Sequence, residues 1–320
     1  MDAIELLVIA NPAADYLRLL NRLPGPVTIH TGMDPEFLAR HAPNADVILQ
    51  GGVKPDLLRA VFPLARRARW IHSLWAGVEK IVFPELVESS ITLTNGRGVF
   101  RDSLAEFAIG SIFFFAKDFR RLVRNQEAGR WEQFDVLEVR QQVLGIVGFG
   151  GIGRETARLA RALGMQVHAV RRRTGGDNSL ADRIFPLKQL REMLAGCDYL
   201  LVSAPLTPET RGMIGEAELA AMKSSAVIIN VGRGPVVVES ALIDALRHGR
   251  LKGAALDVFE TEPLPAGHPF YSLPNVLLSP HSADHTVGWA DLAMYKFIQN
   301  FERFRAGQEL DNVVDKKAGY

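Results

Sequence analysis

The stretch Val143-Leu144-Gly145-Ile146-Val147-Gly148-Phe149-Gly150-Gly151-Ile152-Gly153 decides the fold of this 320-residue chain. It opens with an apolar run typical of a buried parallel strand, and residues 152–163 carry apolar side chains at helical spacing. Glycines between a strand and a helix form the dinucleotide-binding fingerprint. Gly148 permits the tight turn, Gly150 lets the backbone approach a pyrophosphate, and Gly153 lets the helix pack closely on the strand. The alternative is an ordinary strand-to-helix turn.

The end of the next predicted strand, 166–170, indicates which dinucleotide binds. A site for NAD usually places an Asp or Glu there, to bond the ribose hydroxyls. This chain has Arg171-Arg172-Arg173-Thr174 instead. Guanidinium groups pair with a 2′-phosphate, which a carboxylate would repel. The sequence therefore predicts NADPH in preference to NADH. The alternative is a solvated basic loop and an enzyme that uses either cofactor.

Composition is that of an ordinary globular protein long enough for two domains, with 48% hydrophobic and 23% charged residues. A formal net charge of +1 gives no general attraction to nucleic acid or to an anionic membrane. The single cysteine, Cys197, excludes an internal disulfide, and no Cys/His set has zinc spacing. The apolar stretch 108–116 is too short to span a bilayer, and residues 4–10 read as a strand rather than a signal peptide. We expect a cytoplasmic protein without a metal.

The order of predicted elements indicates an α/β fold with two Rossmann-like, doubly wound parallel-sheet domains. A long helix is predicted over 103–128, with Ser103 and Glu106 as a capping box. A last helix over 287–306 is expected to return to the first domain, which makes that domain discontinuous. We predict a substrate domain over 1–97 and 288–320 and a dinucleotide-binding domain over 98–287. The predicted strands are 6–10, 27–30, 46–50, 70–73 and 92–94, then 143–148, 166–170, 199–204, 227–231, 254–258 and 276–279.

Three polar residues follow strands of the second domain, where ligands of doubly wound sheets bind. They are Arg233 after 226–231, Glu262 after 254–258 and His281 after 276–278. A ketone that accepts a hydride needs a proton on its oxygen, and histidine has a suitable pKa. A neighbouring carboxylate favours the imidazolium, and an arginine can hold a substrate carboxylate. Each residue alone could have an ordinary structural role, but their shared placement predicts a catalytic set.

Five stretches of the chain together carry the pattern of a known family. They are Gly148–Gly153, Pro205-Leu206-Thr207-Pro208-Glu209-Thr210, Asn230-Val231-Gly232-Arg233-Gly234, Asp257-Val258-Phe259-Glu260-Thr261-Glu262-Pro263 and Ser279-Pro280-His281. Through these stretches, which cover most of residues 95–285, the chain resembles the D-isomer-specific 2-hydroxyacid dehydrogenases, with the character of NADPH-dependent glyoxylate and hydroxypyruvate reductases. The first domain matches more loosely, through residues 73–79 and 94–98. The resemblance implies that Arg233 binds and polarises a 2-oxo acid, His281 donates the proton and Glu262 assists it.

The resemblance also implies the remaining site residues. The turn Trp75-Ala76-Gly77-Val78 would bind the substrate, with backbone N–H groups on its carboxylate, and Asp257 would contact the nicotinamide carboxamide. Trp75 stands where many relatives have a small or polar residue, so we expect a pocket of different shape. Further cofactor contacts are expected at Gly151, Ile152, Pro205, Val231, Gly232 and Ser282.

Some features leave alternatives open. His281 and His285 have helical spacing, but without an acidic ligand motif they predict no metal site. The run 113–115, three phenylalanines, fits either a buried core or the interface of the homodimer that the resemblance implies, and we favour the interface. Glu262 disfavours a formate-type enzyme, which would need a Gln. A phosphite-type dehydrogenase and a dinucleotide-sensing corepressor remain as rivals, and the sequence does not name the 2-oxo acid.

Overall fold

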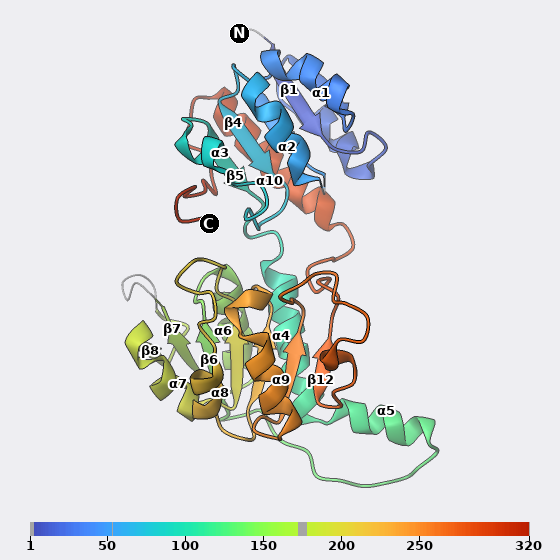
Figure 1. The fold of residues 1–320 in the computed structure, drawn as a ribbon, viewed down its shortest axis with the longest axis vertical. Helices are drawn as coiled ribbons and strands as arrows, with labels where there is room; N and C mark the ends of the chain where they lie inside the picture. Colours follow the sequence, from blue (N-terminus) through green and yellow to red (C-terminus); the bar gives the residue numbers. More distant parts are fainter. Residues whose placement is uncertain (1–2, 53, 172–177, 320) are drawn as a thin grey trace. The chain divides into compact units, whose positions relative to one another are not determined.

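The computed structural model describes residues 3–52, 54–171 and 178–319. They form two compact units, one with the residues up to Phe100 and from Val287, the other spanning Arg101–Thr286. Both units are parallel α/β structures, and the first is discontinuous, which confirms the predicted fold class (Figure 1).

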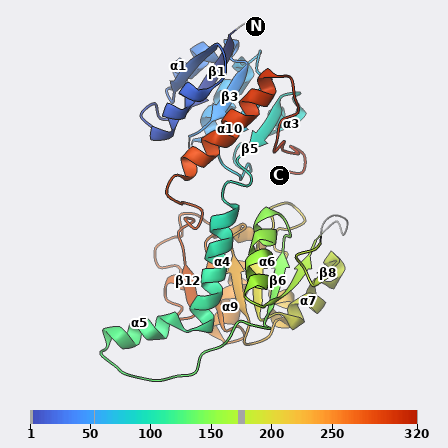
Figure 2. The ribbon, with the colours of Figure 1, turned by 180° about the vertical axis from the view of Figure 1, so that it is seen from behind.

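The described residues of the first unit form a five-stranded parallel sheet with the order β2-β1-β3-β4-β5. Helices α1 (Pro35–His41) and α2 (Pro55–Val61) cover one face of the sheet, and α10 (Trp289–Arg305) covers the other (Figures 1 and 2). Residues facing α1 and α2 include Leu7 and Ile48, whereas Leu6 and Trp70 pack with Phe297 of α10. A short helix, α3 (Pro84–Glu88), precedes the last strand. The strands are β1 (Ile4–Ile9), β2 (Val27–Gly32), β3 (Val47–Gln50), β4 (Trp70–Ser73) and β5 (Thr92–Asn95).

A buried polar cluster lies in this core beneath α10. The Trp70 indole N–H donates to Thr94 Oγ1 at 2.8 Å, and His72 Nδ1 lies 2.7 Å from the same oxygen. His72 Nε2 is buried and has no hydrogen-bond partner among the described residues. Because complete burial disfavours the charged ring, the pKa of His72 falls to about 3. The first unit therefore folds around a neutral histidine.

The second unit has, among its described residues, a seven-stranded parallel sheet with the order β12-β11-β10-β9-β6-β7-β8. Its direction of winding reverses between β6 and β9, which is where doubly wound sheets bind ligands. Helices α4 and α6 cover one face and α7, α8 and α9 the other (Figures 1 and 2). The strands are β6 (Val143–Val147), β7 (Gln166–Val170), β8 (Arg183–Phe185), β9 (Tyr199–Val202), β10 (Val227–Asn230), β11 (Gly253–Leu256) and β12 (Val276–Leu278), and the helices are α4 (Arg101–Ala116), α5 (Phe119–Glu127), α6 (Gly151–Ala162), α7 (Leu190–Gly196), α8 (Glu216–Ala221) and α9 (Glu239–Arg247).

Three predictions about the second unit are wrong in detail. The predicted six strands lack β8, which is only three residues long and pairs with β7 alone. The predicted helix over 103–128 is two helices, because Asp118 takes a left-handed conformation (φ 48°) and caps α5 through the Arg121 N–H. Ser103 is not a cap, because α4 already begins at Arg101 and the Ser103 hydroxyl donates instead to the Ala283 carbonyl.

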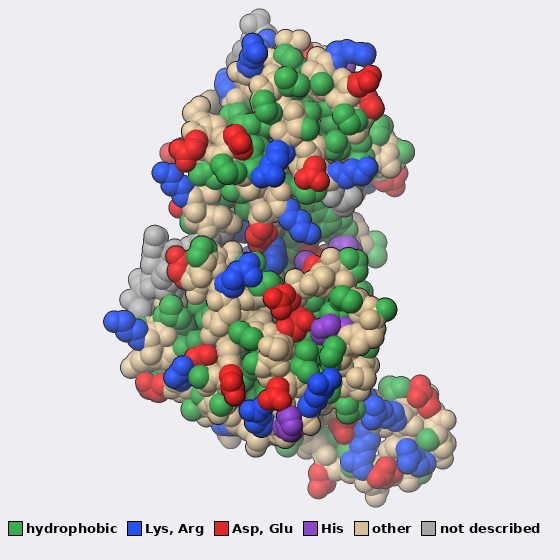
Figure 3. All heavy atoms as spheres, in the orientation of Figure 1, with side chains coloured by type: hydrophobic (Ala, Val, Ile, Leu, Met, Phe, Trp, Pro, Cys, Tyr) green, Lys and Arg blue, Asp and Glu red, His purple; other side chains and the backbone are tan. Residues whose placement is uncertain are grey.

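An arm made of α5 and residues 128–142 extends from the second unit (Figures 1 and 2). It carries several exposed apolar residues, and Trp131 is 96% exposed. The other exposed ones are Phe119, Leu122, Val123, Val136 and Leu137. Over the face seen in Figure 3, side chains of both charges are interspersed, in keeping with the formal net charge of +1.

Candidate active site

Three neighbouring strands of the second sheet carry the predicted catalytic residues just beyond their carboxyl ends. Arg233 follows β10, Glu262 follows β11 and His281 follows β12, and these strands are adjacent in the order β12-β11-β10. Since all three are parallel, their carboxyl ends share one edge of the sheet. The topology thus brings a guanidinium, a carboxylate and an imidazole to one edge of the sheet from three separate segments.

Glu262 and His281 form a direct pair. His281 Nδ1 lies 2.7 Å from Glu262 Oε2, and the other carboxylate oxygen, Oε1, accepts the Phe259 N–H at 3.0 Å. Glu262 is therefore held at both oxygens, and it holds the imidazole in one orientation. With Nδ1 engaged, Nε2 is the ring nitrogen that can reach a substrate.

The contact between Glu262 and His281 raises the pKa of the histidine and lowers that of the glutamate, so both groups favour their charged forms. The bond to Glu262 raises the pKa of His281, against burial and the nearby Arg233 charge, which lower it. Partial burial alone would raise the pKa of Glu262, but the bonds from His281 and from the Phe259 N–H hold it below its ordinary value. An imidazolium that stays protonated above its usual range is suited to donate a proton near neutral pH.

Arg233 sits in a tight backbone segment that brings it toward this pair. Asn230 fixes the segment, since its side chain bonds the Gly232 N–H at 3.1 Å and the Arg233 carbonyl at 3.2 Å. A Cβ on Gly234 would clash with the Phe259 backbone, so glycine permits close approach to the loop that leads to Glu262. The Arg233 charge lowers the pKa of both Glu262 and His281, which places it within electrostatic range of the pair.

The turn that carries His281 is organised by Asp257. The Asp257 side chain is buried, and its Oδ1 accepts the Ser279 hydroxyl at 2.6 Å and the N–H groups of Ser282 and Ala283 at 2.9 and 3.1 Å. His281 itself has φ of 52°, a conformation that costs a non-glycine residue on the order of 1–3 kcal/mol. The three bonds to Asp257 offset that cost. Asp257, predicted only as a cofactor contact, thus also holds the histidine turn, and Ser282 is part of it.

Asp284 is a titratable residue at this turn that sequence reasoning passed over. No hydrogen-bond donor among the described residues reaches its buried Oδ1, and His285 Nε2 lies 3.6 Å from that oxygen. Burial raises the pKa of Asp284, while His285 and His281 oppose the shift. Nothing in the sequence marks Asp284, because its burial depends on the packing of this turn.

The glycine fingerprint forms a cradle at the reversal point of the sheet. Gly148 has φ of 98°, and a Cβ there or on Gly153 would clash with backbone atoms of Ala204 or Gly148. Gly150, in contrast, has no atom within 4 Å of the position of a Cβ. It precedes α6, whose first-turn N–H groups lack partners within the helix. Open space before a helix N-terminus fits a dinucleotide pyrophosphate. Gly151 and Ile152 open the same helix, and Pro205, Val231 and Gly232 follow β9 and β10 at the same sheet edge.

The end of β7 is described only in part. Arg171 Nη1 donates to the Asn178 side-chain oxygen at 2.8 Å, so this guanidinium is anchored beside the strand end. Arg172, Arg173 and Thr174, which were predicted to contact a 2′-phosphate, lie outside the described residues.

In the first unit, the turn after β4 presents a row of backbone donors. Its shape is fixed by Asn95, whose side-chain N–H donates to the Ala76 carbonyl at 2.6 Å. The N–H groups of Ala76, Gly77 and Val78 have no acceptor in the part of the chain that the structure describes. Successive N–H groups in a turn can together bind an anion, so this turn is a candidate binding site for one.

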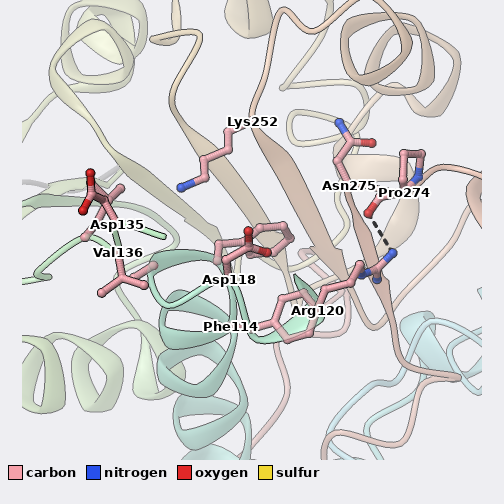
Figure 4. A pocket seen from close by; sticks show the side chains of 11 residues that line it. Phe114, Asp118, Arg120, Asp135, Val136, Lys252, Pro274 and Asn275 are labelled. Carbon is pink, nitrogen blue, oxygen red and sulfur yellow. Dashed lines mark hydrogen bonds between the residues drawn. The ribbon is translucent and has the colours of Figure 1, made fainter. Parts of the chain in front are cut away.

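A separate cavity of about 220 Å³ lies at the opposite, amino-terminal edge of the second sheet (Figure 4). Lys252 and Asn275 precede β11 and β12 there, and Phe114 and Arg120 come from α4 and α5. Arg120 Nη1 donates to the Pro274 carbonyl at 2.8 Å. Phe115 is buried against Gly253, whereas its two predecessors in the sequence are half-buried. This cavity lies apart from the strand ends that carry Arg233, Glu262 and His281.

The described residues contain neither a metal-ligand cluster nor a membrane span. Across residues 3–52, 54–171 and 178–319, no three His, Cys, Asp or Glu side chains are grouped so that they could hold a metal ion. Within the same ranges, no helix has the length and apolar character needed to cross a membrane.

Comparison with known proteins identifies the family. The model of the D-isomer specific 2-hydroxyacid dehydrogenase NAD-binding domain matches residues 109–283, more than half of the chain. The chain belongs to this family. It is therefore an oxidoreductase, with a second unit of the NAD(P)-binding Rossmann type, and the resemblance stated from the sequence is confirmed.

The relatives of this chain carry the names of several activities. A glyoxylate reductase of Aeropyrum pernix is 33% identical over 293 residues, 87% of this chain and 84% of the relative. A D-3-phosphoglycerate dehydrogenase of Methanocaldococcus jannaschii is 29% identical over 98% of this chain, which spans only 59% of that protein. An NADPH-dependent glyoxylate/hydroxypyruvate reductase of Sinorhizobium meliloti, solved with NADP and sulfate, is 26% identical with a TM-score of 0.86 over 99% of this chain and 100% of that one.

Proposed function

We propose that this enzyme reduces 2-oxo acids to D-2-hydroxy acids with NADPH. The observation that carries the proposal is the Glu262–His281 pair, a protonatable imidazole held at 2.7 Å by a carboxylate, with the Arg233 charge in electrostatic range. The glyoxylate and hydroxypyruvate reductases among the relatives support the same chemistry. In this proposal the second unit binds the dinucleotide, and the substrate is bound by Arg233 and by the turn after β4.

Arg233, Glu262 and His281 each have a separate role in the proposed reaction. When bound, NADPH supplies the hydride for the carbonyl carbon and leaves as NADP⁺. As the carbonyl π bond breaks, His281 Nε2 gives its proton to the oxygen, and Glu262 stabilises the imidazolium before that transfer. Arg233 holds the substrate carboxylate and faces the charge that develops on the oxygen. In the oxidation of a hydroxy acid, His281 takes the proton back.

The substrate carboxylate needs donors besides Arg233. We propose that the N–H groups of Ala76, Gly77 and Val78 supply them. The support is their lack of acceptors among the described residues and the small side chains at 76 and 77. Trp75, the first residue of the turn, then borders the position of the substrate.

The preference for NADPH rests on the arginines after β7. Arg171 is anchored by Asn178 at the strand end where an NAD site usually has an acid. Arg172, Arg173 and Thr174 complete the proposed 2′-phosphate site. The test is the ratio of kcat/KM for NADPH to that for NADH, in wild type and in Arg171→Asp. A wild-type ratio below one that does not respond to the substitution would overturn the preference and leave the 2-oxo acid chemistry standing.

The central test is a panel of 2-oxo acids with wild type and His281→Ala. We expect turnover by wild type, and a fall in kcat of about 10²–10⁴-fold in the variant with nearly unchanged NADPH affinity. Wild-type turnover in His281→Ala would remove His281 from the mechanism. Oxidation of phosphite without reduction of any 2-oxo acid would indicate the phosphite-type activity, and NADPH binding without any turnover a corepressor-like role.

We also propose that the protein is a cytoplasmic homodimer, with the arm (α5 and residues 128–142) at the interface. The arm exposes apolar side chains that a second copy could bury, among them Leu122, Val123 and Trp131. The single, buried Cys197 fits a reducing compartment. Light scattering of wild type should give the mass of a dimer, and Val123→Glu should shift it toward the monomer. A monomeric wild type would contradict the proposal.

A further inference from the structure

We propose that the substrate side chain packs against an aromatic wall formed by Trp75, Phe100 and Trp289, so that the preferred substrates are 2-oxo acids with an aromatic or large apolar side chain. This inference rests on the proposed function. The contacts that support it lie entirely within the first unit, in the turn after β4 and the elements packed on that turn.

The backbone of Trp75 is fixed beside the proposed carboxylate donors. Its N–H donates to Ser73 Oγ at 3.2 Å, and its carbonyl accepts the Gly96 N–H at 3.1 Å. A Cβ on Gly96 would clash with the Leu74 carbonyl, so the chain after β5 lies directly against this turn. The next residue, Ala76, is the first of the three whose N–H groups have no acceptor among the described residues. A carboxylate bound there would have the indole as its neighbour.

The indole belongs to a cluster of three rings. Its centroid lies 4.4 Å from that of Trp289 and 6.2 Å from that of Phe100, and the Trp289 and Phe100 centroids are 5.7 Å apart. These spacings are those of packed aromatic rings. Phe100 is buried, whereas both tryptophans keep part of their surface exposed. Trp75 is therefore turned toward its own unit and supported there, and a partly exposed aromatic surface is left beside the turn.

Such a surface discriminates among 2-oxo acids by their side chains. Glyoxylate has only hydrogen beyond its carbonyl carbon and gains nothing from an aromatic wall. The phenyl ring of phenylpyruvate can stack on it and remove apolar area of both partners from water. In an apolar pocket a single methylene changes kcat/KM by about 10–200-fold. A whole ring should therefore favour phenylpyruvate over glyoxylate by at least about tenfold.

The experiment measures kcat/KM for phenylpyruvate and for glyoxylate, each with saturating NADPH. Wild type should prefer phenylpyruvate, and Trp75→Gly and Trp289→Leu should each lower the phenylpyruvate-to-glyoxylate ratio by about tenfold or more. Trp75→Phe, which keeps a ring, should retain most of the ratio. Phe62→Leu is the matched control, because Phe62 packs on the opposite face of the same sheet and its loss should leave the ratio unchanged. Thermal unfolding of each variant separates lost selectivity from lost folding.

Two results would overturn the inference, and they are distinguishable. A wild type that prefers glyoxylate, with Trp75→Gly opening activity toward phenylpyruvate, would show that the indole fills the pocket instead of lining it. That result would leave the proposed reduction of 2-oxo acids intact. Failure to reduce either substrate would refute the proposed function itself, and the aromatic wall with it.

Discussion

Replacing Gly150 by alanine should separate folding from dinucleotide binding. Gly150 has an extended backbone (φ −88°, ψ −154°), and the position of its missing Cβ has no atom within 4 Å. The methyl group therefore fits without strain. Lower chain entropy in the unfolded state stabilises the variant by about 0.4–1 kcal/mol, and the weaker N-cap preference of alanine costs a similar amount. The net change should be within about 1 kcal/mol, or a few degrees in Tm.

Dinucleotide affinity should respond far more strongly. The methyl group would occupy the space through which a pyrophosphate approaches the first turn of α6. Loss of one charge-assisted hydrogen bond costs about 1.5–3 kcal/mol, which corresponds to a Kd roughly 10–150-fold higher. Calorimetric titration with NADPH measures the Kd, and thermal unfolding measures the stability of the same sample.

Two other glycines supply the controls. Gly110 in α4 also has no atom within 4 Å of a Cβ position, so Gly110→Ala should leave NADPH affinity at the wild-type value. Gly153→Ala should instead destabilise the fold, because its Cβ would clash with the Gly148 carbonyl and approach Ile146 at 2.9 Å. If Gly150→Ala bound NADPH as tightly as wild type does, the fingerprint turn would not be the phosphate site, and the reasoning would fail.

Three further substitutions probe the catalytic set and the core of the first unit. Glu262→Gln should lower the pKa of His281, so the loss of reductase activity on the basic side should begin at a lower pH; an unchanged pH profile would show that the two groups are uncoupled. Arg233→Lys should raise KM and lower kcat for 2-oxo acids, since an ammonium cannot form two parallel bonds to a carboxylate; near-neutral kinetics would place Arg233 outside the substrate site. His72 is neutral when folded, with a pKa of about 3 against 6.5 when exposed, so stability should be complete above pH 6.5 and fall by about 2 kcal/mol between pH 8 and pH 5. Urea unfolding of wild type and His72→Gln checks this, and an equal acid sensitivity of the two would contradict it.

The sequence was sufficient to predict the parts of the fold that repeat a simple pattern. The glycine cluster between β6 and α6 marks a turn in which side chains at Gly148 or Gly153 would clash with the backbone. In a parallel sheet the carboxyl ends of all strands lie at the same edge, whatever the order of the strands. That rule predicted where Arg233, Glu262 and His281 would lie, although their roles stay predictions. The short strand β8 could not be found, because three residues form a strand there only by pairing with β7.

The backbone conformations of single residues could not be predicted from the sequence either. The apolar pattern of α4 runs on past Asp118, and nothing in its periodicity shows that this residue turns left-handed and ends the helix. The same holds for the site. That Asp257 binds three donors of the histidine turn depends on contacts across two strand ends, and the burial of Asp284 depends on the packing of that turn.

The discontinuity of the first unit has a consequence for how the chain is made. During synthesis its five strands emerge first, but α10, which covers one face of their sheet, emerges after the whole second unit. Until then Leu6, Val8 and Trp70 lack Phe297 and Phe301, their partners in the finished core. The ribosome-bound chain thus carries an open apolar sheet face for nearly two hundred residues of elongation, at about 5–20 residues per second. A nascent chain of this enzyme should therefore engage chaperones early and release them only when its last helix closes the sheet.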